Sequence, residues 1–150
     1  MEKIESFKII GIAVRTSNQN GQNAVDLGNL WGEFFSKNLL EEIPNCISKD
    51  IFAIYTDYES NFEGTYTAIL GIRVSNFDTV PENVIAREFP SGNFEKFCAK
   101  GIIPNAVIDI WEEIWADDKN LNRKYSYDFE VYSDRSQNGE NSEVDIFIAI

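Results

Sequence analysis

The sequence predicts an α+β fold in which two successive βαββ units share one antiparallel sheet, with the helices on one face and a ligand cleft between the halves. A strand-like segment, Phe52–Asp57, returns 77 residues later as Phe129–Asp134 with the same alternation of apolar and polar types. An amphipathic helical pattern precedes each copy. Because each half would be marginal alone, we expect residues 1–78 and 79–150, approximately, to fold as one domain.

The first unit is predicted to contain a strand over about residues 6–15, a helix over about 26–40, and strands over about 51–58 and 65–74. Apolar residues at i, i+3, i+4, i+7 and i+8 predict the helix, and they are Leu27, Leu30, Trp31, Phe34 and Phe35. Asp26 precedes this pattern, so we expect it to cap the helix N-terminus.

The second unit repeats this order, with an interrupted strand over about 83–99, a helix over about 104–117, and strands over about 126–133 and 143–149. The same helical spacing is carried by Val107, Ile110, Trp111, Ile114 and Trp115. Pro104 suits the first helical turn, where its missing N–H has no intrahelical partner to lose.

The two copies of the repeated strand differ at one position that carries chemistry. Ala53 in the first copy corresponds to Glu130 in the second. Period-two alternation places Glu130 beside Tyr132 and on the opposite face from Phe129. A carboxylate where the equivalent residue carries only a methyl group indicates a site added to a symmetric scaffold.

The helical stripes are predicted to pack on one sheet face, against Phe52, Ile54, Phe129 and Val131. The other face would then carry many aromatic side chains, which need a partner or a cavity to cover them. An apolar cleft with a few converging polar groups is typical of a small-molecule site. The predicted ligand-binding residues are Glu130, Tyr55, Tyr132, Tyr66, Trp111, Phe89 and Phe94.

Glu130 indicates which ligands such a cleft would prefer. An ionised carboxylate among aromatic rings is costly to desolvate unless its pKa rises or a cation neutralises it. Aromatic faces would also attract a cationic ligand. The alternative is that Glu130 forms an ion pair with Arg123, Lys124 or Arg73 at the sheet margin.

The charge balance argues against direct nucleic-acid binding. The chain carries 13 Lys and Arg against 25 Asp and Glu, for a formal net charge of −12. Such a surface repels phosphate backbones, and the sequence shows no basic stripe. The same negative field would concentrate cations near the protein.

Several kinds of site lack the residues that they require. The chain has no histidine and only two cysteines, Cys46 and Cys98, so it offers no His-based triad and no conventional zinc site. Its glycines form no phosphate loop or dinucleotide fingerprint. We therefore expect neither a metal nor a cofactor, and any catalysis would depend on carboxylates, tyrosines or bound water.

The sequence also predicts where the protein resides. No segment approaches the roughly 20 apolar residues that a bilayer-crossing helix needs. The N-terminal residues MEKIESFK contain no apolar signal-peptide core. Two widely spaced cysteines are typical of reduced thiols, so we expect a cytoplasmic protein that does not contact membranes.

The residues around Glu130 resemble the central-glutamate strand of GyrI-like, or AraC-type, effector-binding domains. That strand corresponds to Asp128–Tyr132, and Phe89–Phe97 resembles the family's "iPaG-Y-x-x-F" strand, with Phe94 where tyrosine is common. Gly101 and the following helix resemble the family's glycine-to-helix segment with its "W-x-x-I/L-W" ending. The first half, with Leu30-Trp31-x-x-Phe34, is most similar to the integron cassette-protein and transcription-activator-related branch.

This resemblance implies a tandem βαββ fold that binds amphipathic, often cationic aromatic compounds, with Glu130 facing the ligand. It favours a stand-alone small-molecule sensor related to transcription, whose protein partner the sequence leaves open, existing as a monomer or weak homodimer. One alternative is a hydrolase of reactive xenobiotics, in which Glu130 activates water with help from Tyr55 or Tyr132. Another is inhibition of DNA gyrase at the protein level.

Overall fold

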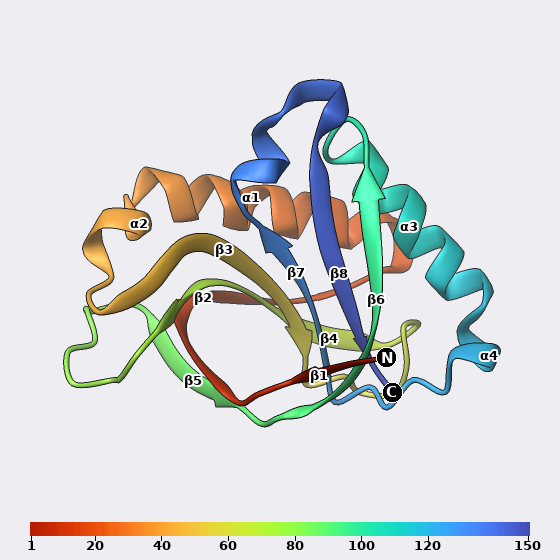
Figure 1. The fold of residues 1–150 in the computed structure, drawn as a ribbon, viewed down its shortest axis with the longest axis horizontal. Coiled ribbons are helices and arrows are strands. Elements are labelled where there is room, and N and C mark those ends of the chain that lie inside the picture. Colours follow the sequence, from red (N-terminus) through yellow and green to blue (C-terminus); the bar gives the residue numbers. More distant parts are fainter.

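The computed structural model describes residues 1–150 and contains one eight-stranded antiparallel sheet with two long helices (Figure 1). The first half comprises β1 (Glu2–Ile4), β2 (Phe7–Ser17), a 3-10 turn (Gln19–Gly21), α1 (Gln22–Ser36), α2 (Leu39–Glu42), β3 (Cys46–Thr56) and β4 (Thr65–Val74). The second comprises β5 (Ile85–Phe89), β6 (Gly92–Lys100), α3 (Asn105–Ala116), α4 (Asp118–Leu121), β7 (Tyr127–Tyr132), 3-10 turns (Asp134–Gln137 and Gly139–Asn141) and β8 (Glu143–Ala149). The predicted α+β class and the two βαββ units are confirmed.

The element boundaries differ most from the prediction at the first helix and at β3, which begins at Cys46 instead of near residue 51. The α1 helix begins at Gln22, and its N-cap is Gly21 in the left-handed conformation. Asp26 is not the cap, because it lies one turn inside the helix and accepts a hydrogen bond from Gln22 Nε2 at 3.0 Å. The predicted interruption near residue 90 is the break between β5 and β6.

The strand order β1-β6-β8-β7-β3-β4-β2-β5 follows the sequence repeat. The repeated strands β3 and β7 are central antiparallel neighbours, and their register places Ala53 directly opposite Glu130. The outer strands are exchanged between halves, since β1 pairs with β6 and β5 pairs with β2. The sheet therefore has an approximate twofold axis that passes between Ala53 and Glu130.

One face of the curled sheet carries a cluster of ten buried residues that includes no helical side chain. Aromatic rings dominate this cluster. Phe52 and Phe129 stack at 5.7 Å, and Phe7 contacts both. Its members are Phe7, Ile9, Phe52, Ile54, Ile69, Phe89, Phe94, Tyr127, Phe129 and Ala149.

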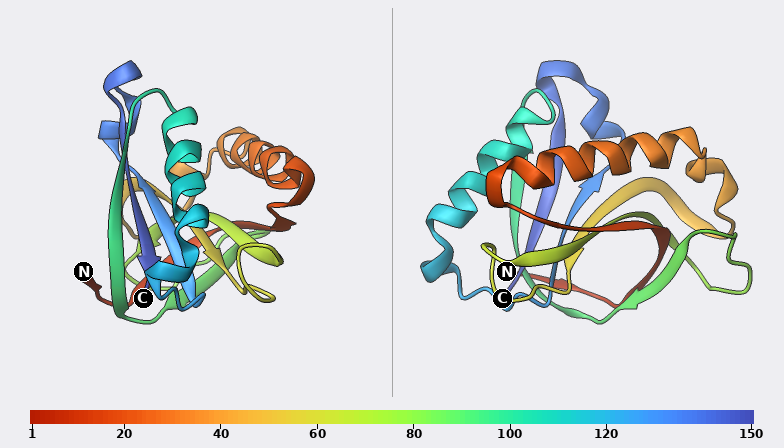
Figure 2. Two further views of the ribbon diagram at one scale, coloured as in Figure 1. Left: turned by 90° about the vertical axis from the view of Figure 1, so that its right-hand side faces the viewer. Right: turned by 180° about the vertical axis from the view of Figure 1, so that it is seen from behind.

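Both long helices cover the opposite face, the one that carries Glu130 (Figures 1 and 2). In α1, Leu30 and Phe34 pack over the strands of the first half. In α3, Val107 and Ile114 pack over those of the second. The prediction that the helices pack against the Phe52 face was wrong, because alternation shows which residues share a face but not which face the helices choose. The curl of the sheet itself buries the Phe52 face.

No helix combines the length and the hydropathy that crossing a bilayer requires.

Two glycines allow the strands β2 and β4 to approach closely where they bend. Gly11 pairs with Gly71, and a Cβ atom at Gly11 would lie 2.0 Å from the Leu70 carbonyl oxygen.

We expect Gly11→Ala to reduce the free energy of unfolding by about 1–3 kcal/mol, because the clash is with backbone. Gly32 is an exposed residue of α1, and a Cβ atom there would meet no atom within 4 Å. Gly32→Ala should therefore increase the free energy of unfolding by about 0.4–1 kcal/mol. Urea unfolding of both variants checks this, and equal effects would contradict it.

Candidate functional site

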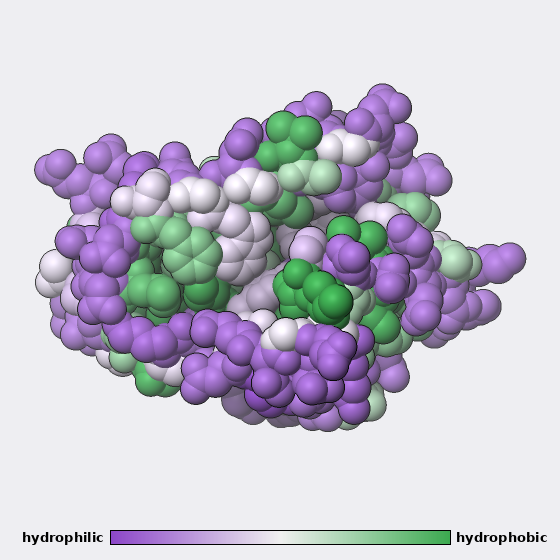
Figure 3. All heavy atoms as spheres, turned by 90° about the horizontal axis from the view of Figure 1, so that it is seen from above, coloured by the Kyte–Doolittle hydropathy of each residue, from purple (hydrophilic) through white to green (hydrophobic).

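A cavity of about 450 Å³ lies between α1 and α3 above the centre of the sheet. Figure 3, which views the molecule from above, shows this region as a hollow with apolar side chains inside and polar ones around it. Eighteen residues line the cavity, 12 of them hydrophobic, and both halves of the chain contribute. The volume lies within the range of pockets for drug-sized molecules.

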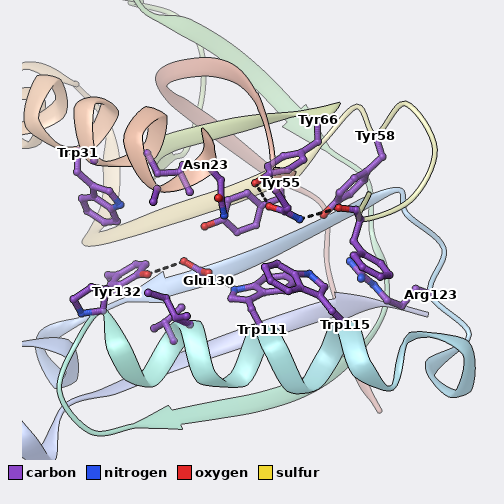
Figure 4. A pocket seen from close by; sticks show the side chains of 18 residues that line it. Asn23, Trp31, Tyr55, Tyr58, Tyr66, Trp111, Trp115, Arg123, Glu130 and Tyr132 are labelled. Carbon is purple, nitrogen blue, oxygen red and sulfur yellow. Dashed lines mark hydrogen bonds between the residues drawn. The ribbon is translucent and has the colours of Figure 1, made fainter. Parts of the chain in front are cut away.

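Side chains from both halves of the chain line the cavity (Figure 4). The first half supplies Asn23, Ala24, Leu27, Gly28 and Trp31 from α1, Asn18 before it, and Tyr55, Tyr58, Phe62 and Tyr66 from β3, β4 and their loop. The second half supplies Val107, Ile108, Trp111 and Trp115 from α3, with Pro104, Arg123, Glu130 and Tyr132. Eight of the 18 lining residues are thus aromatic.

Glu130 lies at the floor of the cavity and is only 2% exposed. Its Oε1 accepts a hydrogen bond from the Tyr132 hydroxyl at 2.7 Å, and its Oε2 accepts one from Trp111 Nε1 at 2.5 Å. The ring of Tyr55 meets that of Trp111 edge-on at 5.6 Å, which completes an aromatic enclosure around the carboxylate. The central position on β7 fixes the carboxylate between the two helices.

Desolvation raises the pKa of Glu130 above its ordinary value, although the donors Tyr132, Trp111 and Tyr55 partly oppose this effect. Desolvation and the nearby Glu130 charge also raise the pKa values of Tyr55 and Tyr132 well above 10.0. Both tyrosines therefore remain neutral phenols that can donate to the carboxylate at any physiological pH.

No cationic side chain pairs with Glu130, so the alternative of an ion pair at the sheet margin was wrong. Arg123 instead binds two other carboxylates, those of Asp118 and Asp128. The Arg73 guanidinium lies 5.8 Å from the centre of the Phe7 ring, on the other face of the sheet. Lys124 makes only a backbone hydrogen bond, to Ala149.

A second buried carboxylate, Asp128, does not line the cavity but binds two residues that do, Arg123 and Tyr58, and its role was missed in the sequence. It accepts hydrogen bonds from Arg123 Nη2 at 2.7 Å, the Tyr58 hydroxyl at 2.6 Å and the Ala149 amide at 2.9 Å. Desolvation raises its pKa, while Arg123 and the two other donors oppose that effect. Alternation along β7 was the available signal, because Asp128 shares a face with Glu130.

The structure brings together five of the seven residues predicted to bind a ligand. Glu130, Tyr55, Tyr132, Tyr66 and Trp111 all line the cavity. Phe89 and Phe94 do not, because they are buried in the cluster on the opposite face. Trp31 and Trp115, which the sequence placed in helical stripes packed on the sheet, pack against the core clusters and also line the cavity. The predicted cleft between the halves is present, but it lies on the face that the helices cover.

A family described as Cass2, integron-associated effector-binding protein, matches residues 1–150. The chain belongs to this family. YobU of Bacillus subtilis (strain 168), whose name describes it as a candidate transcriptional regulator, is 27% identical over 151 residues, covering 95% of this chain and 91% of YobU. These matches agree with the GyrI-like resemblance of the sequence.

Two solved structures show the same architecture. The integron cassette protein VCH_CASS2, from the mobile metagenome of Vibrio cholerae, is 31% identical with a TM-score of 0.75, covering 99% of this chain and 92% of that one. SAV2435, solved with tetraphenylphosphonium bound, is 16% identical with a TM-score of 0.80, covering 99% and 90%. At that lower identity the likeness concerns the fold.

The raised pKa of Glu130 predicts how its removal changes stability with pH. The folded-state pKa of Glu130 exceeds the unfolded value of about 4.3. Wild type is therefore most stable below about pH 4.3, and its free energy of unfolding falls as the pH rises from there to the folded-state pKa. Glu130→Gln does not undergo this fall. The free energy of unfolding of Glu130→Gln minus that of wild type should therefore increase with pH between the unfolded-state and folded-state pKa values of Glu130. Denaturant titrations from pH 4 upward measure this difference. The contribution of Asp128 to the pH dependence cancels, because both proteins contain that residue. A pH-independent difference would contradict the expectation.

Proposed function

We propose that this effector-binding protein binds amphipathic, cationic aromatic compounds in the cavity, with Glu130 as the counter-charge. The observation that carries the proposal is a carboxylate that is 2% exposed, lines an aromatic cavity and has no cationic partner in the protein. Neutral donors satisfy its hydrogen bonds but leave its charge uncompensated. A ligand cation would supply the missing charge.

The walls of the cavity favour the same class of ligand. Indole and phenol faces attract a cation by about 0.5 to 2 kcal/mol each when water is excluded. The rings of Trp31 and Tyr132 meet edge-on at 4.9 Å, and those of Phe62 and Trp115 stack at 6.1 Å, so flat apolar groups find surfaces at both ends. The tetraphenylphosphonium bound by SAV2435 is itself a large aromatic cation. It suggests triaryl phosphonium compounds as probes.

Charge selectivity tests the proposal. Methyltriphenylphosphonium and 1,1,1-triphenylethane have similar size and aromatic surface but differ in charge. Wild type should bind the cation at least about tenfold more tightly, and Glu130→Gln should remove most of that preference while sparing the neutral compound. Isothermal titration calorimetry provides both affinities.

Glu113→Gln is the matched control. Glu113 lies on α3 but is exposed and does not line the cavity, so its replacement changes the net charge equally without altering the site. It should leave the charge preference intact. Equal affinity of wild type for both compounds, or equal losses in the two variants, would show that Glu130 is not the counter-charge.

The affinity for a cation should also depend on pH. Protonation of Glu130 competes with cation binding, so affinity should be constant above the folded-state pKa of Glu130 and should fall below it, levelling off near the affinity of Glu130→Gln. Tyr55, Tyr66 and Tyr132 have raised pKa values and stay neutral throughout this range. Titrations at several pH values should show a flat profile for the neutral compound and for Glu130→Gln. A flat wild-type profile with the cation would contradict the counter-charge role.

A further inference from the structure

We propose that the cavity contains a second polar subsite at Arg123, which donates a hydrogen bond to an uncharged oxygen acceptor of the ligand. This inference deepens the proposed function and rests on it. The preferred ligand would then be an aromatic cation that carries a carbonyl or ether oxygen apart from its charge. Arg123 lines the cavity, and in Figure 4 it lies at the end opposite Trp31 and Tyr132.

The Arg123 side chain is 1% exposed, yet its Nε–H has no hydrogen-bond partner. Its other nitrogens are engaged, since Nη2 donates to Asp128 and Nη1 donates to Asp118 and to the Tyr125 hydroxyl at 3.2 Å. Leaving a buried donor without an acceptor is unfavourable. Because this nitrogen exposes almost no surface, a ligand oxygen reaches it only when the neighbouring side chains move aside, and the hydrogen bond then gains more here than at a solvated donor.

The charges around Arg123 select the kind of acceptor. Asp118 and Asp128 both face the guanidinium, so its positive charge is already compensated. A ligand anion would meet two carboxylates nearby and a third at Glu130, whereas a neutral oxygen would meet only the free N–H. The same compensation explains how an arginine can line a cavity that attracts cations.

The indole of Trp111 sets the spacing between the two subsites. Its Nε1 donates to Glu130, and the Arg123 guanidinium lies 5.9 Å from its ring centre. Glu130 and Arg123 are therefore separated by about the width of one indole. A ligand that uses both subsites must hold its cation and its oxygen at a matching distance, with an aromatic portion along Trp111 and Trp115.

Other polar groups of the cavity are less suited to this role. Asn18 is already held in place, because it accepts from the Tyr66 hydroxyl and donates to the Phe62 carbonyl. The Asn23 side chain makes no hydrogen bond within the protein, but Asn23 is only partly buried, so water can satisfy it. Arg123 is therefore the donor that gains most from a ligand oxygen.

Matched ligand pairs test the proposal. The probes are aryl-alkyl trimethylammonium compounds, each as an aryl ketone and as the analogue with a methylene in place of the carbonyl, with the spacer varied by single methylenes. We expect one spacer length at which wild type binds the ketone about tenfold more tightly than its analogue. The Arg123 Nε–H signal in the ¹⁵N NMR spectrum should shift with that ketone and not with its analogue.

Arg123→Lys keeps the charge facing Asp118 and Asp128 but removes the Nε–H. It should abolish the ketone preference while changing affinity for the methylene analogue only a few-fold, whereas Arg135→Lys, at an exposed ion pair with Asp145, should have no effect. If Arg123→Lys does not fold, the wild-type affinities and the NMR shift still decide.

The possible failures are distinguishable. Cations that bind wild type with no ketone preference at any spacer length would overturn the Arg123 subsite and leave the Glu130 proposal standing. A preference that survives Arg123→Lys but disappears in Asn23→Ala would also overturn it, by placing the acceptor at α1. Failure of every cation to bind, or equal binding of analogues with tert-butyl in place of trimethylammonium, would overturn the proposed function and this inference with it.

Discussion

The antiparallel pairing of β3 with β7 is the constraint on which the rest of the molecule depends. Its register places Ala53 opposite Glu130, two residues that are equivalent in the sequence repeat, so the approximate twofold axis passes between them. The other strand pairs extend symmetrically outward from this centre, up to the exchanged edge strands β1 and β5. The helices then cover one half each, which leaves the cavity directly above the axis.

A site on such an axis cannot itself be symmetric. Residues opposite one another across an antiparallel pair have Cβ atoms about 4.5–5.5 Å apart, so two buried carboxylates there would repel each other strongly. Ala53 relieves this problem, and it is 1% exposed beneath the cavity. The donors that surround Glu130 come from both halves, with Tyr55 from the first and Trp111 and Tyr132 from the second. The repeat thus supplies a scaffold, and a single substitution at its centre supplies the charge.

Much of the fold could be predicted because the repeat is visible in local periodicity. The alternation around Glu130 correctly grouped it with Tyr55 and Tyr132, which share its face. Alternation could not identify the face that the helices cover, so Phe89 and Phe94 were assigned to the cavity instead of the opposite cluster. The role of Arg123 was equally inaccessible, since its ion pair with Asp128 depends on how the loop after α4 meets the edge of the cavity. Local pattern identifies elements and faces, whereas long-range packing decides which faces meet.

The division of the sheet into two faces also explains how the protein tolerates its site. A buried carboxylate without a cationic partner lowers stability, and a cavity forgoes the packing that would fill it. The opposite face offsets both costs with ten buried residues, most of them aromatic, that contain no ionisable group other than Tyr127. Because β3 and β7 alternate, Phe52 and Phe129 stack on that face while Ala53 and Glu130 pair on the other. The same two strands therefore contribute to the core on one face and to the site on the other. Because packing on the face without a ligand stabilises the fold, the cavity face can remain incompletely packed.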